Sequence, residues 1–279
     1  MNSDCSDIDT ELNFSIDGDG KPVVLIHGFA ASNQDWVYLT PDLVEQGFQV
    51  IAPDLIGHGD SNKPLDSGCY TFNFLYNHFT NWINRLENGR KITMVGHSMG
   101  GSIALNYAIQ YPGSVDQLVL INPFFNPNQL NSVLRYINKK PSSYQKVLQR
   151  TPQWLIHTLL SLDVNGWIHY EDRTRQQIAE DYKRASPDIV YIPGSIPDIS
   201  TSILDIQVPT LVIWGTRDIT LNPQSFPQMV ASLPNGYGKA IQGIGHQPHL
   251  ARPEEVNQYI LDFLQNRSVR SFASISIQN

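Results

Sequence analysis

The chain has 279 residues, of which 41% are hydrophobic and 16% are charged, and its formal net charge is −7. This composition is typical of a globular protein with a sizeable core, and it excludes a disordered chain. An acidic balance gives no overall electrostatic attraction to nucleic acid or to anionic lipid. We therefore expect a small-molecule substrate and no nucleic-acid partner.

The start of the chain, MNSDCSDIDTEL, is acidic and has neither the basic residues nor the apolar stretch of a secretory signal. No apolar run approaches the roughly 18 residues that span a bilayer. The two cysteines, Cys5 and Cys69, are expected to be free thiols, because Cys5 lies in a terminus predicted to fray. A cytoplasmic location is the resulting expectation.

Short apolar runs alternate with helical patterns, which predicts an α/β fold with a parallel sheet covered by helices. In chain order, the first predicted elements are a strand at 22–26, a helix at 35–46, a strand at 48–52, a helix at 72–86, a strand at 91–95, a helix at 99–110 and a strand at 115–121. After a long interval come a strand at 209–214, a helix at 225–233, a strand at 237–241 and a helix at 253–264.

The interval at 123–208 has no clear pair of strands and is rich in polar helix formers, prolines and aromatic residues. We predict that it is a helical cap (lid) inserted into a core made of residues 1–122 and 209–279. Trp154, Trp167 and Phe124 are candidates to bind substrate. The alternative is that such aromatic residues form the core of the insertion itself.

The motif Gly96-His97-Ser98-Met99-Gly100 lies between a predicted buried strand and a predicted helix, and Gly101 follows it. In this context the pattern G-x-S-x-G indicates a nucleophile elbow, in which a strained turn presents the serine hydroxyl. The glycines provide clearance around that turn. The alternative is a glycine-rich turn without chemistry.

A serine nucleophile needs a base and a group that orients the base. Among the eight histidines, His246 follows the last predicted strand and comes after a Gly-x-Gly loop, so we favour it over His249 as the base. Asp218 follows the strand at 209–214 and is the predicted orienting acid, although a solvated loop carboxylate is the alternative. The order serine, aspartate, histidine is the one expected for a fold with such a nucleophile elbow.

The developing oxyanion needs backbone donors as well. The loop after the first predicted strand contains Phe29, and Met99 follows the predicted nucleophile. We predict that the backbone N–H groups of Phe29 and Met99 form the oxyanion hole.

These motifs resemble those of the α/β-hydrolase superfamily, in its lid-bearing, serine esterase-like branch. The resemblance covers most of residues 20–265 outside the insertion and is carried by His27-Gly28-Phe29, Trp36, residues 54–61 (DLIGHGDS), residues 96–101, residues 209–218 and Gly245-His246. It implies an eight-stranded, mostly parallel sheet with helices on both faces and a cap between the sixth and seventh strands. It also implies that Asp54 and Ser61 brace a loop and are not catalytic.

Branches of the superfamily are partly separated by their motifs. Ser98 argues against haloalkane dehalogenases and epoxide hydrolases, which carry a carboxylate at the elbow. The loop at 28–31 lacks the Gly-Gly-Pro-Gly of the iminopeptidases. Carbon–carbon bond hydrolases of ring-fission products often have Asn before the nucleophile and Trp after the histidine, where this chain has His97 and Gln247.

The function predicted from the sequence is a serine hydrolase that cleaves carboxylic esters of small to medium apolar substrates through an acyl-enzyme. Ser98 attacks, His246 transfers the proton and Asp218 orients the imidazole. No metal or organic cofactor is implied, and the protein is expected to be a monomer or a homodimer. A carbon–carbon bond hydrolase with the same triad, or a weakly catalytic ligand receptor on this fold, are the alternatives.

Overall fold

The computed structural model describes Cys5 and residues 11–87, 89–161 and 170–265. One sheet contains the strands β1 (Phe14–Asp17), β2 (Lys21–Ile26), β3 (Phe48–Pro53), β4 (Ile92–His97), β5 (Val115–Ile121), β6 (Thr210–Gly215) and β7 (Gly236–Ile241). Their order across the sheet is β1-β3-β2-β4-β5-β6-β7, and only the pairing of β1 with β3 is antiparallel. The predicted α/β-hydrolase fold is confirmed.

The expected count of eight strands is wrong for the described part of the chain, where the sheet has seven. That count came from the resemblance and not from the residues. Before β2, the described chain supplies the single strand β1, which pairs with β3 at the edge of the sheet.

The core helices are α1 (Leu39–Glu45), α2 (Phe72–Glu87), α3 (Met99–Gln110), α8 (Ser225–Ser232), α9 (Pro248–Ala251) and α10 (Pro253–Leu264). The helices between β5 and β6 are α4 (Ser132–Asn138), α5 (Pro141–Arg150), α6 (Gln153–Ser161) and α7 (Asp172–Arg184). Short 3₁₀ turns are η1 (Asn33–Trp36), η2 (Ser67–Cys69), η3 (Pro127–Gln129), η4 (Pro187–Tyr191), η5 (Pro193–Ser195) and η6 (Ser202–Asp205).

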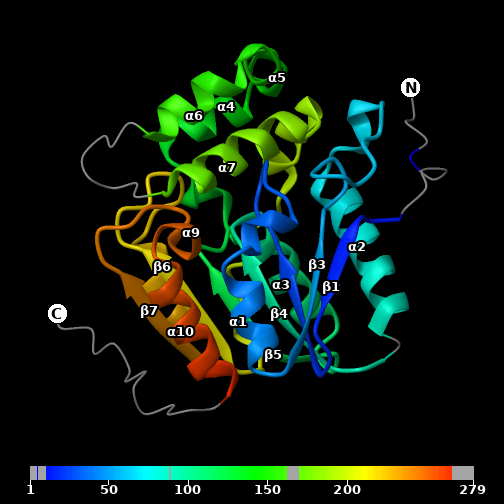
Figure 1. Cartoon of the computed structure of the whole chain (residues 1–279), viewed down its shortest axis with the longest axis vertical. Helices are drawn as coiled ribbons and strands as arrows, with labels where there is room; N and C mark the ends of the chain where they lie inside the picture. Colours follow the sequence, from blue (N-terminus) through cyan, green and yellow to red (C-terminus); the bar gives the residue numbers. More distant parts are fainter. Residues whose placement is uncertain (1–4, 6–10, 88, 162–169, 266–279) are drawn as a thin grey trace.

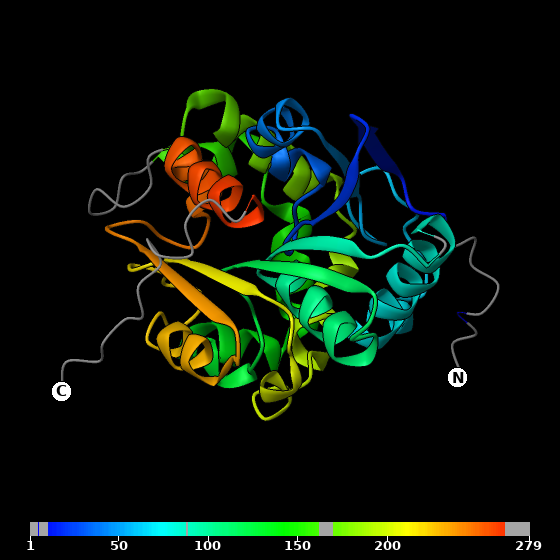
Figure 2. The ribbon, with the colours of Figure 1, turned by 90° about the horizontal axis from the view of Figure 1, so that it is seen from below.

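Strand β2 shows how the sheet is covered on both faces. Val24 and Ile26 pack with side chains of α2, α3 and α8, whereas Val23 and Leu25 pack with α1 and α10. Successive strand residues point to opposite faces, so a strand that is buried on both sides is a continuous apolar run. Figure 2 shows the sheet between these two helical layers.

We call residues 123–208 the cap segment, and its helices α4 to α7 lie over one end of the sheet (Figure 1). Its described part consists of helices, 3₁₀ turns and loops, with one isolated bridge from Leu130 to Leu221 of the core. Side chains of α4, α5 and α7 share a cavity with Ser98, which follows the carboxyl end of β4. The cap segment therefore covers the carboxyl edge of the sheet, where open α/β sheets bind ligands.

The expectation of two free thiols is wrong, because Cys5 and Cys69 form a disulfide. Their Cα atoms lie 5.8 Å apart, within the usual range for such a bond. Cys69 is buried in η2, so the bond joins the start of the chain to the core across 64 residues of sequence. Disulfides persist in oxidising compartments, which weakens the argument for a cytoplasmic location. Among the described residues, none of the helices has the length and apolar character that a membrane span requires.

Candidate active site

The turn between β4 and α3 holds Ser98 in a strained conformation. Its φ is +50° and its ψ is −111°, which is rare for a residue with a side chain. A Cβ atom on Gly96 would lie 2.5 Å from the carbonyl oxygen of Gly100, and one on Gly101 would lie 2.9 Å from Cβ of Pro123. The glycines thus leave room for the chain to turn tightly around Ser98.

Ser98, His246 and Asp218 form a chain of hydrogen bonds. His246 Nε2 lies 2.9 Å from Ser98 Oγ, and His246 Nδ1 lies 2.7 Å from Asp218 Oδ2. A carboxylate only accepts, so Nδ1–H donates to Asp218 and Nε2 is left to accept the hydroxyl proton of Ser98. The geometry therefore matches a serine poised to lose its proton to a base.

Asp218 is held by bonds to both of its carboxylate oxygens. Oδ1 accepts from the backbone N–H groups of Thr220 at 2.7 Å and Leu221 at 3.0 Å. Burial would raise the pKa of Asp218, but its interactions with His246 and these donors outweigh burial and lower that pKa. Asp218 is therefore ionised at neutral pH.

Asn122 is a site residue that the sequence analysis did not identify. Its Nδ2 donates to Asp218 Oδ2 at 2.7 Å, and the residue is fully buried with a φ of +42°. A positive φ is tolerated by asparagine better than by most residues, so the identity of Asn122 suits both its backbone and its bond. Asn122 directly follows β5, which pairs with β6, the strand that precedes Asp218. This position in the sequence could have identified Asn122 as a neighbour of Asp218.

Ser98 and His246 open onto a cavity of about 270 Å³ with a mostly apolar lining. The core contributes the apolar lining residues Phe29, Ala30, Ala31, Met99 and Leu221. The cap segment contributes Phe124, Leu130, Leu134, Ile137, Ile178, Val190, Pro193 and Ile196. Phe124 thus lies where a substrate-binding residue is expected.

The two tryptophans of the cap segment do not support their predicted role. Trp154 on α6 is 68% exposed and does not line the cavity, so its assignment as a substrate-binding residue is wrong. The order of apolar residues in α6 does not show which side of that helix faces the core. Trp167 lies outside the described residues.

Phe29 and Met99, the predicted oxyanion-hole residues, both line the cavity beside Ser98. Met99 is the first residue of α3, so its N–H has no acceptor within the helix. His27 fixes the other loop: its Nε2 accepts from Leu55 N at 2.9 Å and its Nδ1–H donates to Gly28 O at 2.7 Å. Both loops are therefore held at the edge of the site.

His249, the alternative base, lies in a different buried group. It is 2% exposed, and its Nε2 lies 3.6 Å from Asp35 Oδ2, whose other neighbour is His97 Nδ1 at 3.3 Å. Burial would raise the pKa of Asp35, but the two histidines outweigh burial and lower that pKa. Carboxylate and imidazole groups are also metal ligands, and the three ligand atoms lie within 4.8 Å of one another.

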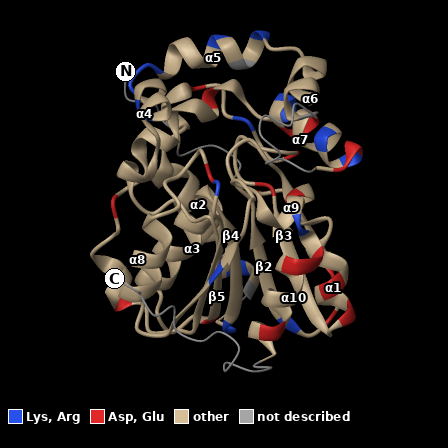
Figure 3. Ribbon diagram, turned by 90° about the vertical axis from the view of Figure 1, so that its left-hand side faces the viewer, with Lys and Arg blue, Asp and Glu red and all other residues tan. Residues whose placement is uncertain are grey.

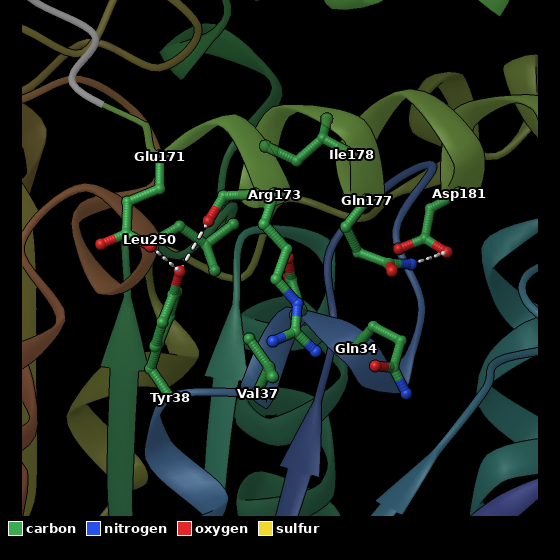
Figure 4. Close-up of a pocket in the computed structure, with 11 residues that line it drawn as sticks. Gln34, Val37, Tyr38, Glu171, Arg173, Gln177, Ile178, Asp181 and Leu250 are labelled. Carbon is green, nitrogen blue, oxygen red and sulfur yellow. Dashed lines mark hydrogen bonds between the residues drawn. The ribbon is translucent and has the colours of Figure 1, made fainter.

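A second, smaller cavity of about 110 Å³ lies between η1 and α7 (Figure 4). Its polar lining includes Tyr38, whose hydroxyl lies 2.8 Å from Thr174 Oγ1, and Gln177, whose Nε2 donates to Asp181 Oδ1 at 3.1 Å. Asp35 and Asp181 line both cavities. Burial raises the pKa of Asp181 to about 6.

Asp54 and Ser61 support the loops around the site. Asp54 Oδ1 accepts from Asn33 N at 2.7 Å, and its Oδ2 accepts from Asp60 N and Asn13 Nδ2, each at 2.8 Å. Ser61 Oγ donates to the Asp54 carbonyl. These bonds fit the loop-bracing role that the resemblance implies.

Comparison with known proteins places this chain among hydrolases. It is 28% identical over 283 residues to a cis-3-alkyl-4-alkyloxetan-2-one decarboxylase from Shewanella oneidensis, covering 91% of this chain and 85% of the relative. It is 24% identical to Lipase 1 from Psychrobacter immobilis, covering 85% and 74% of the two chains. A solved thermophilic esterase from Thermogutta terrifontis superposes with a TM-score of 0.76 at 25% identity, covering 91% and 93%. The model of the alpha/beta hydrolase fold family matches residues 21–253, and the chain belongs to that family.

Proposed function

We propose that this protein is a serine hydrolase that cleaves carboxylic esters through an acyl-enzyme. The observation that carries the proposal is the chain of hydrogen bonds from Ser98 through His246 to Asp218, at 2.9 and 2.7 Å, on the wall of an apolar cavity. Membership of the alpha/beta hydrolase fold family supports the broader assignment, that the protein is a hydrolase.

In the proposed mechanism, Ser98 Oγ attacks the ester carbonyl carbon while His246 Nε2 takes the hydroxyl proton. Asp218 accepts from His246 Nδ1–H throughout and stabilises the imidazolium. The tetrahedral oxyanion accepts hydrogen bonds from the N–H groups of Phe29 and Met99. His246 then returns the proton to the leaving alcohol. A water, deprotonated by the same nitrogen, releases the acid and restores Ser98.

The cavity supports a substrate of limited size. Its volume of about 270 Å³ lies just below the range of roughly 300–1,000 Å³ that is common for small-molecule sites. We propose that the cap segment, residues 123–208, acts as the lid that supplies its outer wall. Short apolar acyl or alcohol groups should therefore be preferred to long chains.

The proposal is tested by labelling with a fluorophosphonate probe and by steady-state turnover of p-nitrophenyl esters of increasing acyl length. Ser98→Ala should abolish both signals, and His246→Ala should nearly do so. Ser102→Ala, one turn further along α3, is the matched control and should keep the label. His249→Ala should also keep it, because His249 faces Asp35 and not Ser98.

Two outcomes would redirect the assignment. Labelling of Ser98 without steady turnover of any ester would favour the ligand-receptor alternative. Turnover of ring-fission dienones at rates above those of esters would favour a carbon–carbon bond hydrolase. Absence of both labelling and turnover would refute the serine-hydrolase mechanism.

A further inference from the structure

The charges of this acidic chain are unevenly distributed. Helices α4, α5 and α6, residues 132–161, contain five of the 19 lysines and arginines and none of the 26 aspartates and glutamates. The five cations are all exposed: Arg135, Lys139, Lys140, Lys146 and Arg150. Figure 3 shows basic residues and no acidic ones along α4 and α5. At physiological salt the Debye length is about 8 Å, so this local charge and not the net charge governs what approaches the surface.

Large apolar side chains are exposed on the same three helices. They are Val133 and Tyr136 on α4, Val147 on α5, and Trp154 and Leu159 on α6. Val133 and Trp154 are each 68% exposed. We call these five residues and the five cations the basic–apolar face. Five of the eleven exposed large hydrophobic residues of the described chain thus fall within residues 132–161.

Helix α4 has one broad apolar side, made of Val133, Leu134, Tyr136 and Ile137, and only part of that side faces the catalytic cavity. Leu134 and Ile137 line the catalytic cavity, whereas Val133 and Tyr136 are exposed, and none of its residues is fully buried. In α5, Tyr144 lines that cavity and Val147 is exposed. Part of the apolar side of α4 is therefore left exposed beside the cavity.

We propose that the basic–apolar face binds the surface of a membrane or lipid aggregate that carries anionic headgroups. Exposed aromatic and aliphatic side chains enter the interface, and the surrounding lysines and arginines pair with the headgroups. The exposure of Val133 and Val147 among the cations of α4 and α5 favours lipid over nucleic acid, because aliphatic side chains gain little from a phosphate backbone. Delivery of an apolar ester from that surface into the adjacent cavity would follow, and this last step rests on the proposed function.

Binding is tested with the full chain and vesicles of phosphatidylcholine, with and without 30% phosphatidylglycerol, by co-sedimentation. We expect binding to the anionic vesicles that falls at least tenfold between 0.1 and 0.5 M NaCl, and little binding to the neutral ones. Lys139→Glu combined with Lys140→Glu should weaken the binding at least tenfold. The matched control, Lys21→Glu with Lys91→Glu, reverses two exposed lysines at the amino ends of β2 and β4 and should bind like the wild type.

Trp154 provides a second readout in a Trp167→Phe background, because Trp36, Trp82 and Trp214 are at most 5% exposed and Trp167 lies outside the described residues. Anionic vesicles should shift the tryptophan emission to shorter wavelength, and Trp154→Phe should remove most of the shift. Ser98→Ala should bind vesicles like the wild type, which separates a failure of the ester chemistry from a failure of this proposal. Equal binding to both kinds of vesicle, no binding, or tighter binding to an oligonucleotide than to anionic vesicles would overturn it.

Discussion

The ring Nε2 of His97 lies 3.1 Å from the backbone carbonyl oxygen of His246. A carbonyl only accepts, so Nε2 carries a proton, and the opposite nitrogen faces Asp35 Oδ2 at 3.3 Å. The residue before the nucleophile thus holds the backbone of the proposed base. His97 is a positioning residue in this arrangement, since it acts through His246.

This contact predicts that His97→Ala lowers kcat by about 10- to 100-fold, because it leaves the partly buried carbonyl of His246 without its donor. KM should change less than about threefold. His97→Gln can place an amide N–H near the lost Nε2 and should recover part of kcat, whereas the shorter His97→Asn should not. Steady-state ester kinetics check this, and equal losses in all three variants would contradict a positioning role.

Asn122 offers a test of the electrostatics around Asp218. Asn122→Asp keeps a residue that tolerates the φ of +42° but places a carboxylate against Asp218 Oδ2. We expect a loss of at least about 100-fold in kcat/KM, because repulsion weakens the hold on His246. Asn122→Gly keeps the backbone, removes the donor and should lose about tenfold. If the glycine variant is the more impaired of the two, the loss comes from packing and not from charge.

The strain at Ser98 predicts a gain in stability when it is released. Ser98→Gly should raise the free energy of unfolding by about 1–3 kcal/mol, because glycine adopts a φ of +50° without cost. Ser98→Ala, which keeps the Cβ atom, should not gain in this way. Both variants should be inactive, so thermal unfolding is the measurement, and identical melting temperatures would argue against strain.

The disulfide predicts a thiol-dependent stability. Cys69→Ser should lower the free energy of unfolding by roughly 4 kcal/mol, the value expected for a closed loop of this length. Wild-type protein in dithiothreitol should melt at the temperature of the variant, and the variant should be insensitive to the reductant. Two titratable thiols in the unreduced wild-type protein would contradict the bond.

Asp181 predicts a dependence of stability on pH. Its pKa is raised from 3.8 to about 6 by burial, so its contribution to stability is fully present below about pH 4 and is lost as the pH rises through 6. Asp181→Asn should therefore be more stable than the wild type at pH 8, by roughly 1–3 kcal/mol. The gain should vanish near pH 4. Urea unfolding at both pH values checks this, with the exposed Asp172→Asn on the same helix as the control.

Some of this architecture follows directly from local sequence. The bounds of α3, β5 and α10 agree with the predicted ranges 99–110, 115–121 and 253–264, because each has a strong apolar pattern and clear ends. The meeting of Ser98, Asp218 and His246 follows from one rule, that parallel strands end at the same edge of the sheet. Their catalytic roles remain predictions.

Other features depend on distant parts of the chain. Strand β1 alternates apolar and polar residues over only four positions and is mostly exposed, so its pairing with β3 defines it. The disulfide depends on a fold that brings Cys5 to Cys69. The role of Asn122 depends on a positive φ that no local pattern signals. The exposure of Trp154 depends on how α6 is rotated, and its pattern leaves that open.

The chain leaves the sheet at the carboxyl end of β5, after Ile121, and re-enters at the amino end of the parallel strand β6, where Thr210 pairs with Leu118. The intervening segment therefore has two parts: the helices α4 to α7, and a return stretch with η6, which contacts α3 and α8 of the core. Insertions or deletions within α4 to α7 need not disturb the strands that precede Ser98, Asp218 and His246. The wall of the cavity can therefore change in length and shape while the return stretch and the reaction centre keep their places.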